Sequence, residues 1–82
     1  MEGTNTEVNV TILISDREYH VQVEEMTGLQ LKELAGIPST NILYREIRGP
    51  GEDEKIDNDT VVHLHSGDKF YDMPPGNFGE LR

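Results

Sequence analysis

The order of apolar and polar residues predicts four strands and one helix. Apolar residues alternate with other residues from Val8 to Ile14 and again from Tyr19 to Val23, which is the period of a strand with one covered face. The short polar segment Ser15–Glu18 between them predicts a four-residue turn and an antiparallel hairpin. Two further strands are expected over 42–47 and 60–65, separated by an acidic loop over 48–59.

The helix is expected over Thr27–Gly36. Thr27 is suited to be its N-cap, and Gln30, three residues later, completes a capping box. Gly36 stands where a left-handed residue ends a helix, and Pro38 prevents its continuation. The expected apolar stripe consists of Leu31, Leu34 and Ala35, whereas Gln30, Lys32 and Glu33 are expected to face water.

A helix of this length is not stable alone in water, so it must cover the apolar face of the sheet. If the first strand and the strand over 60–65 pair in parallel at the centre, one helix crosses a four-stranded mixed sheet. The fold class is then α+β. We expect a flexible leader over 1–7, a folded domain over 8–71 and an extended C-terminal tail over 72–82.

Composition narrows the classes of function. The chain has 82 residues, enough for one small domain, and 34% of them are hydrophobic. Sixteen acidic residues against 7 basic ones give a net charge of −9, which disfavours nucleic acid and anionic membranes as main partners. There is no cysteine, and we see neither a signal peptide nor a membrane-spanning run, which fits a cytoplasmic protein.

No candidate for metal or catalytic chemistry is complete. His63 and His65 project to one side of a strand, but a metal needs a third ligand. Asp57-Asn58-Asp59 is similar to the start of a calcium loop, but the glycine and the later glutamate of such a loop are missing. We therefore expect no metal, no cofactor and no enzymatic activity.

Several local phrases, in this order and spacing, resemble a ubiquitin-like β-grasp domain of the prokaryotic multiubiquitin type. The resemblance covers residues 8–79. The phrases that carry it are Thr27-Gly28, Leu34-Ala35-Gly36-Ile37-Pro38, Leu43-Tyr44, Asp59-Thr60-Val61-Val62-His63-Leu64, Gly67 with Phe70, and Pro74-Pro75.

The resemblance implies a small bacterial protein modifier. Such domains occur with an activating enzyme, a conjugating enzyme and a processing peptidase, and some belong to antiviral systems. Their chemistry lies at a C-terminal carboxylate, which becomes an acyl-adenylate and then a thioester on the partner enzymes before it joins target proteins. A slim glycine is expected at that end, so cleavage after Gly79 or after Gly76 is expected here.

Two other functions remain open. One is a β-grasp interaction module that is never conjugated, and the other, ranked last, is a sulfur carrier. In the ubiquitin family partners dock on the open face of the sheet, although the pattern does not decide whether Leu43 or Tyr44 points outward. The candidate partner-binding residues are Leu13, Leu43, Tyr44, Val61, Phe70 and Tyr71.

Overall fold

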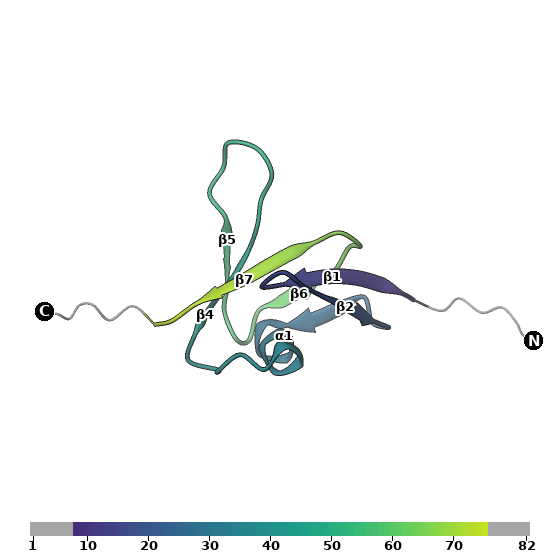
Figure 1. The fold of residues 1–82 in the computed structure, drawn as a ribbon, viewed down its shortest axis with the longest axis horizontal. Coiled ribbons are helices and arrows are strands. Elements are labelled where there is room, and N and C mark those ends of the chain that lie inside the picture. Colours follow the sequence, from purple (N-terminus) through teal and green to yellow (C-terminus); the bar gives the residue numbers. More distant parts are fainter. Residues whose placement is uncertain (1–7, 76–82) are drawn as a thin grey trace, which may run out of the picture.

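The structure is a computed structural model and describes residues 8–75 (Figure 1). Within this range the chain forms seven strands and one helix. They are β1 (Val10–Ile14), β2 (Arg17–Val21), β3 (Glu25–Thr27), α1 (Gly28–Ala35), β4 (Ile42–Arg45), β5 (Glu54–Ile56), β6 (Val61–His63) and β7 (Lys69–Met73).

Five of the strands form one mixed sheet in the order β2-β1-β7-β4-β5. β1 and β7 are parallel, and the other neighbours are antiparallel. The predicted α+β class and mixed sheet are confirmed, but the predicted number of four strands is wrong. The parallel neighbour of β1 is also not the segment 60–65: it is β7, with Ile14 opposite Phe70.

The segment 60–65 pairs elsewhere because of where its apolar side chains lie. Its regular part, β6, forms a separate two-stranded sheet with β3, in which Met26 lies opposite Val62. Val62 and Leu64 reach the core from that position. The place beside β1 is then left for β7, whose alternation buries Phe70 and turns Tyr71 away from the core.

The first hairpin is tighter than expected. Its turn consists of Ser15 and Asp16, both with positive φ (51° and 69°), as in a two-residue turn that matches the twist of the strands. Arg17 and Glu18, expected in the turn, pair instead with β1.

The helix has the predicted ends. The Thr27 hydroxyl accepts a hydrogen bond from the Gln30 amide at 3.1 Å, and the Gln30 side chain accepts one from the Thr27 amide at 2.9 Å. Gly36 is left-handed, with φ of 72°. The capping box and the glycine C-cap are therefore confirmed.

The buried side of the helix differs from the prediction. Leu31 is fully buried, but Leu34 is 38% exposed, and Lys32, expected to face water, is only 3% exposed. Lys32 can be buried because its ammonium group donates hydrogen bonds to the Ser39 and Asn41 carbonyls and to the Asn58 side chain.

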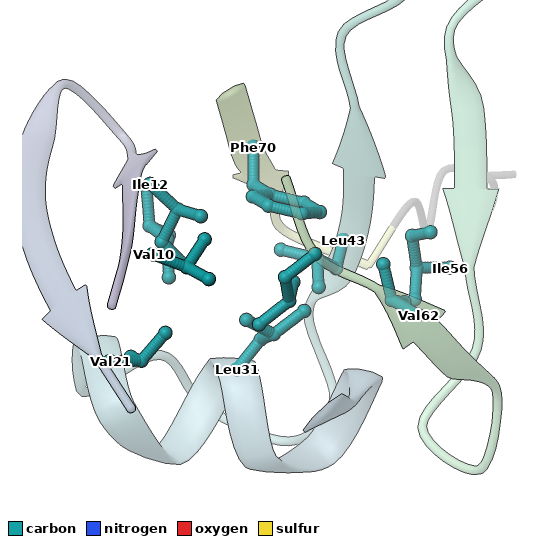
Figure 2. Packing of buried hydrophobic residues seen from close by; sticks show 10 residues of the cluster. Val10, Ile12, Val21, Leu31, Leu43, Ile56, Val62 and Phe70 are labelled. Atoms are coloured by element: carbon teal, nitrogen blue, oxygen red, sulfur yellow. The ribbon is translucent and has the colours of Figure 1, made fainter. Parts of the chain in front are cut away.

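The core lies between α1 and one face of the five-stranded sheet (Figure 2). Its apolar side chains come from the helix, from every strand except β3, and from Leu64, which follows β6. They are Val10, Ile12, Ile14, Val21, Leu31, Leu43, Ile56, Val62, Leu64 and Phe70.

The last strand extends past the predicted end of the domain at residue 71. β7 continues to Met73, and the Asp72 carboxylate, expected to begin an exposed tail, accepts hydrogen bonds from Ser15 Oγ (2.8 Å) and Asn41 Nδ2 (2.9 Å). These contacts join the ends of β1 and β4 to β7. The predicted leader, 1–7, and most of the predicted tail lie outside the described residues.

Candidate interaction surface

The face of the five-stranded sheet opposite α1, here called the outer face, brings together three of the predicted partner-binding residues. Leu13, Tyr71 and Tyr44 lie on the adjacent strands β1, β7 and β4 and point away from the core, because each follows or precedes a buried residue. Tyr44 lies directly opposite Tyr71, and their rings are stacked with centroids 5.4 Å apart and planes inclined by 18°. Leu13 and Tyr71 line a small surface cavity of about 160 Å³.

The other three predicted residues are not on this face. Leu43 and Phe70 are 0% and 2% exposed, since each is the inward member of its strand, so their prediction as surface residues is wrong. Val61 is 53% exposed but belongs to β6 in the second sheet. The prediction that Val61 lies on a strand next to Leu13 depended on pairing the segment 60–65 with β1, and that pairing is wrong.

Two apolar residues of the outer face were missed from the sequence. Ile42 and Met73 lie opposite each other at the ends of β4 and β7, next to the tyrosine pair, and Met73 is 49% exposed. The alternation through Leu43 could have identified Ile42 once Leu43 was known to be buried. Met73 was missed because it was assigned to the tail.

Tyr71 is held in position by the loop between β4 and β5. Its hydroxyl donates a 2.5 Å hydrogen bond to Asp53 Oδ2, while Asp53 Oδ1 accepts the Ile47 amide at 3.0 Å. The bond to Asp53 raises the pKa of Tyr71 to about 12. The bonds from the Ile47 amide and from Tyr71 lower the pKa of Asp53. The loop, which projects from the sheet in Figure 1, is thus tied to the outer face at its base.

The residues considered for metal binding make ordinary pair contacts. His63 Nδ1 lies 3.2 Å from Glu25, the residue opposite it in the second sheet, and Asp68 accepts the His65 amide at 3.0 Å. Among residues 8–75, no three His, Asp or Glu side chains come together as a metal site would require. The predicted cleavage positions Gly76 and Gly79 lie outside the described residues.

In the part of the chain that the structure describes, no helix is long and apolar enough to cross a membrane. The mixed sheet with a parallel central pair, covered on one face by a single capped helix, defines a ubiquitin-like β-grasp domain. A family model described as Multiubiquitin matches residues 10–71, so the chain belongs to the Multiubiquitin family. No curated protein and no solved structure matches the chain.

Proposed function

We propose that this chain is a bacterial, cytoplasmic ubiquitin-like modifier. In this proposal a peptidase trims its C-terminal tail to expose a glycine, an activating enzyme forms the acyl-adenylate and thioester, and a conjugating enzyme transfers the chain to target proteins. The chain itself performs no catalysis. An antiviral system is the biological setting that the prokaryotic multiubiquitin type suggests.

The observation that carries the proposal is the position of the β7 end. Tyr71 and Met73 lie on the outer face, and β7 continues into Pro74 and Pro75, which are both exposed. Gly76 follows directly in the sequence. A partner that covers the stacked tyrosines therefore lies next to Pro74 and Pro75, which directly precede Gly76 in the sequence, so recognition of the domain and chemistry at that glycine can be coupled.

The test is an intact-mass measurement of the protein recovered from cells that also express its genomic neighbours. We expect loss of the mass of Glu80-Leu81-Arg82 together with heavier, conjugated species, and we expect Gly79→Glu to abolish both. Gly51→Glu is the matched control, because Gly51 lies in the exposed β4–β5 loop with open space around it. If the protein instead loses the six residues after Gly76, and Gly76→Glu abolishes this loss, the cleavage occurs after Gly76.

A second function, the unconjugated interaction module, is favoured by the same stacked pair taken alone. Tyr44 and Tyr71 present an aromatic surface that needs no tail, and surfaces of this kind mark protein interaction sites. If this reading is right, the mass stays that of the full chain without adducts. Binding to a neighbour-encoded protein then survives removal of residues 76–82 and is lost in Tyr44→Ser. A terminal thiocarboxylate would instead identify the sulfur carrier.

A further inference from the structure

A second surface lies on the helix side of the molecule, away from the five-stranded sheet. It is an open groove of about 470 Å³ where β3 continues into α1. Here it is called the helix-side groove. Its lining residues are Val23, Glu25, Met26, Gln30, Glu33 and Leu34.

The apolar part of the groove consists of two exposed side chains and one that is only partly buried. Val23 is 46% exposed because β2 ends at Val21, and Leu34 is 38% exposed because α1 turns Leu31 and Lys32 toward the interior. The third residue, Met26 in β3, lines the same groove and is half buried against the core. Exposed apolar side chains that gather in a groove are typical of a site for a partner.

The charged part of the groove is acidic. Glu25 and Glu33 line it, and no lysine or arginine does. The basic side chain near Glu25 is His63, whose Nδ1 lies 3.2 Å away and which does not line the groove. The one lysine on the same helix, Lys32, cannot neutralise them, because its ammonium group is buried among the oxygens of Ser39, Asn41 and Asn58. The outer face differs in this respect, since its exposed residues include Lys55 and Lys69.

We propose that the helix-side groove docks a segment of a protein partner in which an apolar side chain is flanked by lysine or arginine. Charge complementarity selects this occupant: the apolar side chain covers Val23, Met26 and Leu34, while the basic residues pair with Glu25 and Glu33. A second copy of this chain is a poor occupant, since two chains of charge −9 repel each other. The groove and the outer face share no residue.

The probe for the test is a synthetic helical peptide with leucines at i, i+3 and i+4 spacing and lysines at the remaining positions. It is titrated into the ¹⁵N-labelled full chain and followed by amide chemical shifts at low salt. We expect the largest shifts at Val23, Glu25, Met26 and Leu34, with little change at Tyr44 and Tyr71. A twin peptide with glutamate in place of lysine is expected not to bind.

Two variants and one control distinguish specific binding in the groove from nonspecific electrostatic attraction. Glu33→Lys is expected to raise the Kd for the lysine-containing peptide about tenfold. Glu52→Lys makes the same charge change in the exposed β4–β5 loop and is expected to stay within about twofold of wild type. Leu34→Ser leaves the charge unchanged and is expected to weaken binding severalfold, because it removes the exposed apolar contact.

Four outcomes would overturn the proposal. They are equal effects of Glu33→Lys and Glu52→Lys, wild-type binding by Leu34→Ser, shifts centred on the tyrosine pair, and self-association of the chain that Glu33→Lys abolishes. None of these measurements uses the C-terminal tail, so the result is independent of whether the chain is conjugated.

Discussion

The ammonium group of Lys32 donates a 2.6 Å hydrogen bond to the side-chain oxygen of Asn58, 26 residues away in the sequence. The same group binds the carbonyl of Ser39 at 3.0 Å and that of Asn41. One helical side chain therefore holds together the segment after α1 and the turn before β6. Removing a charged group from water is costly, and these oxygens offset that cost.

Replacing Lys32 by methionine keeps the apolar stem and removes the ammonium group. The three oxygens then lose their common donor, so we expect the free energy of unfolding to fall by about 1–3 kcal/mol. Urea denaturation measures this. Lys55→Met, at an exposed position of β5, is the control. Its free energy of unfolding is expected to stay within about 0.5 kcal/mol of the wild-type value. Equal stability of Lys32→Met and wild type would contradict a stabilising role of the buried amine.

The lysines also differ in their chemical accessibility. Lys55 and Lys69 are exposed, whereas Lys32 is 3% exposed. Brief treatment of the folded protein with an amine-reactive acetylating reagent should therefore modify the first two and spare Lys32. Peptide mass mapping detects the difference, and denaturant should remove it. Early acetylation of Lys32 in the folded protein would contradict its buried position.

Gly28 is required by the close approach of α1 to the chain before β6. A Cβ atom at this position would lie 2.2 Å from the carbonyl oxygen of Asp57, a backbone atom that cannot turn away. Alanine is the better helix former by about 1 kcal/mol, so propensity alone predicts that Gly28→Ala stabilises. We expect the steric clash to outweigh the gain in helix propensity. The free energy of unfolding of the variant, measured by urea denaturation, should therefore fall by about 1–3 kcal/mol. Gly51→Ala, with open space around it, is the control.

A substitution at Gly36 measures the cost of backbone strain in the absence of a steric clash. No atom lies within 4 Å of a Cβ built there, but the residue has φ of 72°. Gly36→Ala should therefore lower the free energy of unfolding by about 1–2 kcal/mol through the left-handed conformation alone. Gly36→Asn should lose less, because asparagine tolerates this conformation. If alanine and asparagine proved equally stable, the strain explanation would be wrong.

The hydrogen bond between Tyr71 and Asp53 predicts how stability depends on pH and how the Tyr71 hydroxyl titrates. The pKa of Tyr71 is raised to about 12, so the contribution of this bond to stability is present below pH 10 and is lost as the pH rises through 12. The pKa of Asp53 is lowered from 3.8, so its contribution is present above that value and is lost as the pH falls through the lowered pKa. In Asp53→Asn, absorbance titration should place the Tyr71 pKa nearer to 10, and Tyr71→Phe identifies its signal. An unchanged Tyr71 pKa in Asp53→Asn would exclude Asp53 as the cause.

The local elements were predictable because their signals lie within a few residues. The capping box of Thr27 and Gln30 and the left-handed Gly36 follow from nearest-neighbour chemistry, and the alternation of β1 follows from strand geometry. Ile12 and Ile14, two apolar members of this alternation, are fully buried. The resemblance to the Multiubiquitin family, whose model matches residues 10–71, also depends on short motifs and their spacing.

Strand pairing was not predictable from these signals. Both 60–65 and 69–73 carry apolar residues at alternate positions, and either could lie beside β1. The choice depends on how Val62 and Phe70 fill one shared core, which involves residues that are distant in the sequence. The wrong pairing placed Val61 on a strand next to Leu13. Met73 was assigned to the tail for a different reason, because Pro74 and Pro75 follow it and disfavour a central strand.

Short-range signals were enough to predict the helix and its ends, the first hairpin, the α+β class and the ubiquitin-like family, since these depend on local periodicity, capping chemistry and short motifs. The strands β3, β5 and β7 were not predicted, and β5 lies within the segment 48–59 that was expected to be a loop. Long-range packing determines that Tyr44 and Tyr71 stack on the outer face while Leu43 is buried. It also determines that Lys32 is buried while Leu34 is exposed to water. The physical reason is that the side of a strand or helix that becomes buried depends on what packs against it. For Lys32, the oxygens that make burial possible come from Ser39, Asn41 and Asn58, none of which lies in the helix.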